Sequence, residues 1–325
     1  MGTGASRAAS GITIQFDQAE PFVAGQHVTG TVVFNNTFVD NVKLQRIGAE
    51  LVGEVVYTTK QYNGSGYRNV THHKTFFQQS QCLQEEQNGF YLENGYCSWP
   101  VAFSLADFLP PTLNQLSCHG PFIRYKICIV FQRPEKYKMN VHREFFISII
   151  AHPSSYSHLT YLPVEATNNN RSDVTLHAAL TDHNGPLTPD DKFLLNIVLN
   201  NPNHTTIKCI SIDLVQNRTI AMGGHCTLAI PLSEMPQLQE FSGEHYHETL
   251  ELAIPVDNFI IPSFYYISPK FSEKPISVEY MIKIEAKFHG FFKNFIVNIP
   301  IIIQSTQIFI EIPPSYEAAV AVATQ

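Results

Sequence analysis

Neighbouring cysteine and histidine residues are the groups in this sequence best suited to catalysis or metal binding. Three such groups are present: Cys118-His119, His225-Cys226 and His245-Tyr246-His247. A thiolate beside an imidazole can act as a nucleophile, and both side chains bind zinc. Adjacent residues on a strand point to opposite faces, however, and no Cys-x-x-Cys pair accompanies these groups. We therefore expect structural or exposed roles for them, with no bound metal and no cofactor.

Motifs of the common enzyme classes are missing as well. The sequence contains no G-x-S-x-G, no P-loop and no G-x-G-x-x-G, and the glycines at 64 and 66 lie in a polar stretch without a following helix. We expect a protein that is not an enzyme.

A basic segment lies at residues 124–143, in the later part of the first half. Six cations fall within twenty residues, opposed only by Glu135 and Glu144: Arg124, Lys126, Arg133, Lys136, Lys138 and Arg143. They could form a face that contacts a membrane or phosphate groups, although a solvated strand face also accounts for them. The whole chain has a net charge of −7, so we expect no nucleic-acid partner.

The first six residues, Met1 to Ser6, fit the M-G-x-x-x-[ST] pattern for myristoylation of Gly2, which short termini also match by chance. One acyl chain holds a protein on a membrane only marginally, so the basic segment would have to assist. No apolar signal segment precedes residue 10, and no apolar run reaches the roughly 18 residues that span a bilayer. We expect a cytoplasmic protein with reduced cysteines and peripheral membrane association.

The elements that must position these residues are strands. The chain has 325 residues, enough for two domains of about 150 residues. Hydrophobic residues make up 44% and charged residues 15%, and the 23 Phe, 14 Tyr, 20 Pro and 17 Gly are typical of short strands separated by turns. The composition predicts an all-β protein.

Alternating apolar residues locate the clearest strands, at 123–131 and at 276–288. Polar stretches at 61–66 and 78–95 are expected to be loops, and a Ser-, Pro- and Asn-rich stretch places a domain boundary near residue 163. We predict two tandem antiparallel β-sandwiches with immunoglobulin-like halves, at 11–163 and 164–305, followed by a short tail at 306–325.

Several stretches resemble one family. ITIQFDQAEPFVAGQHVTGTVVF (12–34) is similar to the first hairpin of arrestin-fold proteins, and WPVAFSLADFLPPTL (99–113) followed by HGPFIRYKICIVFQRP (119–134) resembles the arrestin amino-domain signature. NGPLTPDDKFLLNIVLNNPNHTTIKCISIDLVQ (184–216) and ISVEYMIKIEAKFHGFFKNFIVNIPIII (276–303) are similar to strands of the carboxy domain. The resemblance covers about residues 11–305 and implies the arrestin fold.

The tail indicates a branch of that family. Pro313, Pro314 and Tyr316 form a P-P-x-Y motif that resembles the ligase-recruiting motif of the α-arrestins, the arrestin-domain-containing proteins. Two prolines favour the polyproline II conformation that the aromatic groove of a WW domain accepts, with the tyrosine in a neighbouring pocket. The same prolines could simply end the 307–312 stretch. Many α-arrestins have longer tails with two such motifs, and this chain has one.

The resemblance implies a non-catalytic trafficking adaptor. Such a protein links cytosolic segments of membrane-protein cargo to a WW-domain HECT ubiquitin ligase for ubiquitination, endocytosis and sorting, and is recruited to the plasma membrane and endosomes. One alternative is an arrestin-fold scaffold in endosomal sorting that recruits no ligase. Another is an extracellular adhesion protein, which would require disulfides among the six cysteines.

Overall fold

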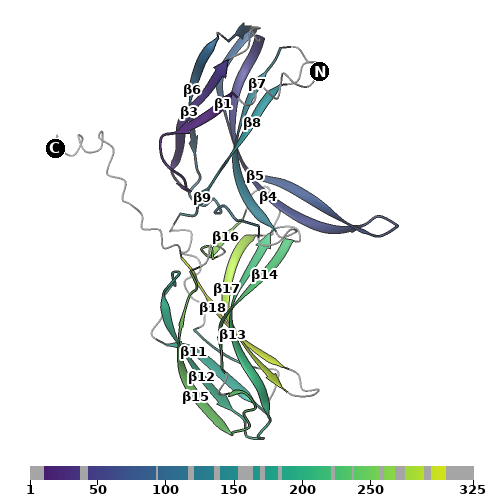
Figure 1. The fold of residues 1–325 in the computed structure, drawn as a ribbon, viewed down its shortest axis with the longest axis vertical. Helices are drawn as coiled ribbons and strands as arrows, with labels where there is room; N and C mark the ends of the chain where they lie inside the picture. The colour runs from purple at the N-terminus through teal and green to yellow at the C-terminus, as the bar shows by residue number, and fades with distance from the viewer. Residues whose placement is uncertain are drawn as a thin grey trace, which may run out of the picture.

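Strands account for the regular structure of the chain. The computed structural model describes residues 11–36, 43–92, 94–115, 121–134, 140–152, 164–168, 173–181, 185–220, 224–235, 238–256, 260–267, 275–288 and 294–304, and these ranges contain no α-helix. Within them, no helix is therefore available to span a membrane. The predicted all-β fold class is confirmed (Figure 1).

The first half is a sandwich of two main sheets. One sheet has the order β1-β3-β6 and the other the order β5-β4-β7-β8, while β2 and β9 form a short parallel pair. The strands are β1 (Ile12–Phe16), β2 (Phe22–Val23), β3 (His27–Asn36), β4 (Lys43–Tyr62), β5 (Tyr67–Tyr91), β6 (Gly95–Ser104), β7 (Phe122–Gln132), β8 (Val141–Ile147) and β9 (Ile149–Ile150).

The second half repeats this architecture. One sheet has the order β10-β11-β12-β15, and the other the order β14-β13-β17-β16, with β18 also paired to β17. The strands are β10 (Glu165–Thr167), β11 (Thr175–Thr181), β12 (Lys192–Asn200), β13 (Ile207–Ile220), β14 (Gly224–Glu234), β15 (His245–Ala253), β16 (Phe264–Tyr266), β17 (Ile276–Phe288) and β18 (Phe295–Ile301).

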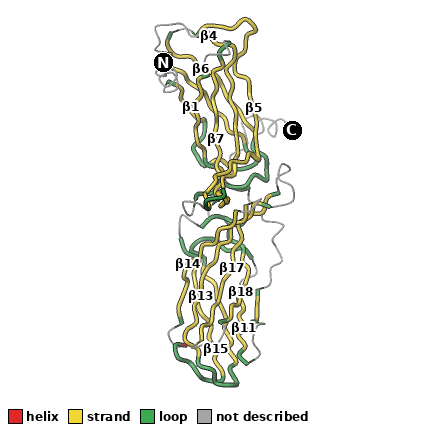
Figure 2. The backbone as a smooth tube through the Cα atoms, turned by 90° about the vertical axis from the view of Figure 1, so that its right-hand side faces the viewer, coloured by secondary structure: helices red, strands yellow, loops and turns green. Residues whose placement is uncertain are grey.

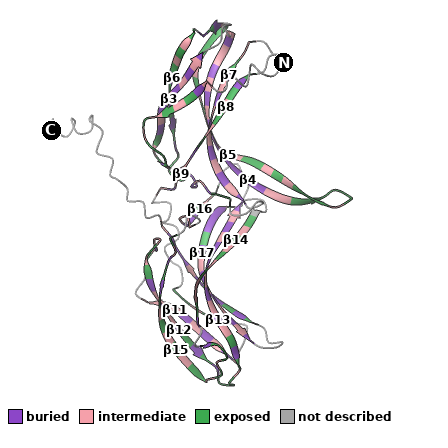
Figure 3. Cartoon of the chain, viewed as in Figure 1, coloured by how far each residue is buried: buried purple, intermediate pink, exposed green. Residues whose placement is uncertain are grey.

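Alternation of apolar residues places the core of each sandwich between its sheets. In β7, Ile123, Tyr125, Ile127, Ile129 and Phe131 are all buried, and every second residue of β17 from Ile276 to Phe288 is buried as well. Successive side chains of a strand point to opposite faces, so one apolar series covers one face of each sheet. Both predicted strands are confirmed (Figure 3).

One predicted loop is wrong. The polar stretch 78–95 is mostly strand, because β5 continues to Tyr91. Two of its glutamines bond to the backbone of β6. Gln79 and Gln81 accept hydrogen bonds from the backbone N–H groups of Ser104 and Ala102, at 3.0 and 2.9 Å. Polar side chains here replace a missing neighbouring strand, so a polar sequence does not indicate a loop.

The strands β4 and β5 also build a long hairpin that leaves the body of the molecule. The predicted loop at 61–66 is shorter in the structure, because β4 extends to Tyr62 and β5 begins at Tyr67. The outer part of the hairpin, residues 55–75, projects sideways from the region where the two sandwiches meet (Figure 1). We call this segment the arm.

Sheet pairing separates the two halves. Among the described residues, every paired strand has its partner in its own half, and the sandwiches lie end to end along the long axis (Figure 2). The expected boundary near 163 and the tail at 306–325 lie outside the described residues, so the domain limits stay a prediction.

Candidate functional site

A buried carboxylate organises the charged side chains on the outer face of the first half. Glu54 lies on β4 within the apolar run Val52 to Val56, and only 5% of its surface is exposed. The register places it directly opposite Arg124 of β7, and Arg124 Nε donates a hydrogen bond to Glu54 Oε1. A charge buried this deeply needs such a partner, because burial removes its water.

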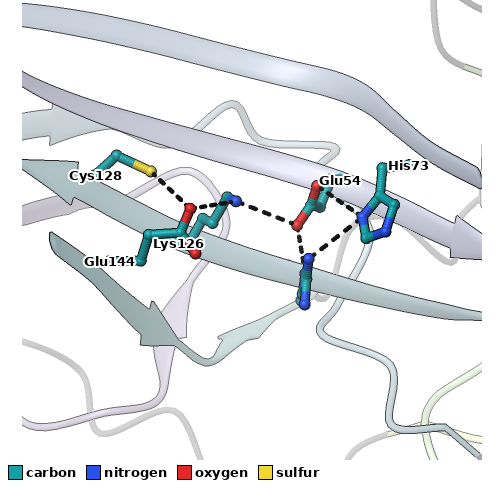
Figure 4. Close-up of polar contacts among 6 residues, drawn as sticks. Glu54, His73, Lys126, Cys128 and Glu144 are labelled. Carbon is teal, nitrogen blue, oxygen red and sulfur yellow. Dashed lines mark hydrogen bonds and ion pairs between the residues drawn. The ribbon is translucent and has the colours of Figure 1, made fainter. Parts of the chain in front are cut away.

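Three further side chains complete the cluster around Glu54, as Figure 4 shows. Lys126 Nζ lies 3.6 Å from Glu54 Oε1 and donates to Glu144 Oε1 of β8 at 2.8 Å. His73 Nδ1 of β5 lies 3.6 Å from Glu54 Oε2. The charge cluster, which comprises Glu54, His73, Arg124, Lys126 and Glu144, therefore crosses all four strands of the sheet.

The protonation states of the cluster follow from these contacts. Burial opposes the charged form of Lys126, but the hydrogen bond with Glu144 and the charges of Glu54 and Glu144 outweigh it and raise the pKa of Lys126. The hydrogen bond from Lys126 lowers the pKa of Glu144 despite partial burial. Both groups are thus charged at neutral pH.

Cys128 neighbours this cluster but is not activated by it. Its Sγ lies 3.9 Å from Glu144 Oε1, and burial, followed by the charge of Glu144, raises the pKa of the thiol to about 11. The nucleophilic form of cysteine is the thiolate, so this thiol is unreactive at neutral pH.

The described cations of the predicted basic segment do not share one face. Arg124 and Lys126 point outward and are paired with carboxylates, whereas Arg143 lies opposite Ile129 of the inner face. Arg143 Nη1 donates to the carbonyl of Ile12 at 2.5 Å and so links β8 to β1. Arg133 lies beyond the end of β7, and its Nε is buried without a partner among the described residues.

The remaining predicted site residues lie outside the described residues: Gly2, Lys136, Lys138, Pro313, Pro314 and Tyr316, together with Cys118 and His119. His225 and Cys226 are adjacent on β14, and His245 and His247 both lie on β15. Within the described ranges, no group of three His, Cys, Asp or Glu side chains could hold a metal ion.

A second polar cluster lies where the two halves meet. Arg218 of β13 is 1% exposed, and its Nη1 donates to the carbonyl of Asn114 in the first half at 2.5 Å. Its Nε donates to Gln216 Oε1 at 2.7 Å, and Gln216 in turn donates to the Tyr280 hydroxyl. Burial lowers the pKa of Arg218 to about 10, so the side chain still carries its charge at neutral pH.

The segment that precedes Asn114 is held from several sides. Tyr125 OH donates to the carbonyl of Pro110 at 2.5 Å. The Thr112 N–H donates to the Ile149 carbonyl, and the Ile149 N–H donates to the Thr112 hydroxyl. Next to it, an apolar groove of about 390 Å³ is lined by both halves, by Phe108, Leu109, Pro110 and Ala151 from the first and by residues 264–267 from the second. The FLPPTL stretch therefore positions the junction between the sandwiches.

Residues 12–152 match the family model described as "Arrestin (or S-antigen), N-terminal domain". The first half of the chain is thus similar to an arrestin N-terminal domain. The match ends with the first sandwich, whose strands β1 to β9 span Ile12–Ile150. Curated proteins gave no match to the chain. The arrestin resemblance of the first half is confirmed, and its FLPPTL and IRY stretches form the segment and the strand described above.

Sequence reasoning missed Glu54 and His73. The only signal for Glu54 was a single carboxylate inside an apolar strand run, GEVV, which requires a charged partner once the strand is buried. His73 gave no comparable signal.

Proposed function

We propose that this chain is an α-arrestin-type trafficking adaptor. The arrestin N-terminal domain supports a non-enzymatic adaptor or scaffold role in general. The P-P-x-Y motif at Pro313, Pro314 and Tyr316 is the observation that carries the more specific proposal, because its partner is a WW domain and WW domains are found in HECT ubiquitin ligases. In this proposal the two sandwiches bind cytosolic segments of membrane-protein cargo, and the tail recruits the ligase.

The proposed sequence of events needs no chemistry from this chain. The tail brings the ligase to the bound cargo, the ligase transfers ubiquitin, and the modified cargo is sorted at the plasma membrane and endosomes. The role of the adaptor is to raise the local concentration of ligase at its substrate. A single P-P-x-Y motif buries little surface, so its affinity for one WW domain is expected to be micromolar, or about −8 kcal/mol.

Titration of a tail peptide tests this function. A peptide of residues 307–325 is titrated against isolated WW domains from several HECT ligases, with the Tyr316→Ala peptide as the control. Loss of an aromatic anchor costs about 2 kcal/mol or more, so the control should bind at least roughly thirtyfold more weakly. Ser315→Ala should bind as the unchanged peptide does, because the x position of the motif points away from the groove.

Equal binding of the two peptides would remove the ligase from the proposal. The chain would then be an arrestin-fold scaffold in endosomal sorting. A comparison in cells separates the same two functions: full-length Tyr316→Ala should keep its cargo and lose the ligase in co-precipitation.

A further inference from the structure

The tip of the arm is a turn with several internal hydrogen bonds, and none of the described residues covers it. Asn63 Oδ1 accepts hydrogen bonds from the backbone N–H groups of Ser65 and Gly66, at 3.2 and 3.1 Å, and Asn63 N–H donates to the Gly66 carbonyl at 3.0 Å. Tyr62 OH closes the turn on the Gly64 carbonyl at 3.0 Å. A Cβ added at Gly64 or Gly66 would meet no atom within 4 Å. The tip therefore stands free of the described chain.

Two tyrosines flank this turn and remain exposed. Tyr62 and Tyr67 are opposite each other in the register, so they lie on the same face of the arm. Their rings meet edge to face at 5.5 Å, yet 65% of Tyr62 and 77% of Tyr67 is exposed. Tyrosine rings with an apolar body and a polar end are enriched where lipid headgroups meet hydrocarbon.

The charge of the arm is opposite to that of the whole chain. Residues 55–84 contain no Asp or Glu but include Lys60, Arg68 and Lys74, in a protein of net charge −7. Arg124 and Lys126, at the base of the arm, are paired with Glu54 and Glu144. Within the described part of the chain, the three cations of the arm have no such carboxylate.

We propose that the tip of the arm binds anionic membrane surfaces. Lys60 lies on the face of Tyr62 and Tyr67, whereas Arg68 lies opposite Gln61 on the other face. Lys74 shares the face of Arg68, so a peptide bound along one face of the arm would meet either Lys60 or Arg68 and Lys74, but not all three cations. Lys60 and Arg68 reach the same partner only at the tip, where a broad, flat anionic surface can contact the two faces together with the tyrosines. Anionic lipid headgroups provide such a surface.

Vesicle binding of the full-length, non-acylated chain tests this assignment. Binding is measured by co-sedimentation with vesicles of phosphatidylcholine alone and of phosphatidylcholine and phosphatidylserine in a three-to-one ratio. We expect binding only to the second kind, and weaker binding at high salt. The double substitution Lys60→Gln/Arg68→Gln should weaken it about thirtyfold, and Tyr62→Ser/Tyr67→Ser should weaken it as well.

A matched control distinguishes the arm from the overall charge. Lys192→Gln/Lys208→Gln makes the same change in net charge at two exposed positions of the second half and should leave vesicle binding unchanged. An equal loss in the control, or undiminished binding of the arm variant, would overturn the proposal. So would binding of an acidic peptide by the arm, with no binding to phosphatidylserine vesicles.

Tryptophan fluorescence gives a second measurement on the same surface. The chain has one tryptophan, Trp99, which is 9% exposed, so Tyr67→Trp adds a distinct exposed reporter. Its emission should shift to shorter wavelength with phosphatidylserine vesicles and not with phosphatidylcholine alone; an unchanged spectrum would contradict insertion of the tip. No WW domain is present in these measurements, so this proposal and the WW-domain proposal can fail separately.

Discussion

Arg124 donates a hydrogen bond from Nε to Glu54 Oε1 across neighbouring strands, although the two residues are 70 positions apart in the chain. The pair joins β4 to β7 at the base of the arm. Arg124 also lies over the rings of Phe122 and Phe146, at 5.8 and 5.3 Å from their centroids. The guanidinium is thus fixed both by charge and by aromatic contact.

Removal of the buried carboxylate should destabilise the first sandwich. Glu54→Gln leaves Arg124 without its charged partner and Lys126 with Glu144 alone, while the shape of the side chain is kept. Breaking a fully buried pair lowers the free energy of unfolding by about 3–5 kcal/mol. Because Arg124 is partly exposed, we expect a decrease of about 2 kcal/mol. Urea unfolding followed by circular dichroism measures this. Glu86→Gln, an exposed carboxylate on β5, should change the free energy of unfolding by less than about 0.5 kcal/mol.

Acid should weaken the contact between Lys126 and Glu144. The pKa of Glu144 is lowered in the folded chain, so its contribution is present above the unfolded value of about 4.3 and is lost as the pH falls through the folded value. The pair is partly exposed, so its contribution is below about 1 kcal/mol. Thermal unfolding between pH 3 and pH 7 should show a smaller acid-induced decrease in Glu144→Gln than in the unchanged chain. Equal decreases would mean that the pair contributes nothing.

Arg218 should stabilise the junction between the sandwiches. Arg218→Ala leaves the Asn114 carbonyl and the Gln216 amide oxygen without their buried donor and creates a cavity, with an expected cost of about 3 kcal/mol. Cleavage between the halves by a protease should also become faster, because one contact between them is lost. Lys208→Ala removes an exposed cation of the same half and should leave both unfolding and cleavage unchanged.

The cysteines should differ in reactivity according to their surroundings. Cys82, Cys97, Cys128, Cys209 and Cys226 are free thiols in the structure, and Cys82 is the exposed one among them. A thiol reagent at neutral pH should therefore modify Cys82 faster than Cys128, whose pKa is about 11. Mass spectrometry of partly modified protein measures the order. Early modification of Cys128 would show that the sheet opens locally around Glu144.

Local patterns were enough to predict the strands that face a core. The alternation from Ile276 to Phe288 predicts β17 with its bounds, because a strand buried on one face needs an apolar residue at every second position. The same reasoning fails where polar side chains bond to the neighbouring sheet. Residues 78–91 look like a loop for this reason, although Gln79 and Gln81 complete the edge of β6.

The sequence by itself determined the all-β class, the alternating core strands, and the P-P-x-Y and basic motifs, because composition and short-range spacing encode these features. Only the tertiary structure decided which charges meet. Arg124 and Arg143 are close in the chain. Arg124 is paired with Glu54 on the outer face of the sheet, whereas Arg143 bonds to the carbonyl of Ile12 in the other sheet of the sandwich. Strand register sets these contacts over long sequence separations, and a shift by one residue would move every side chain to the other face.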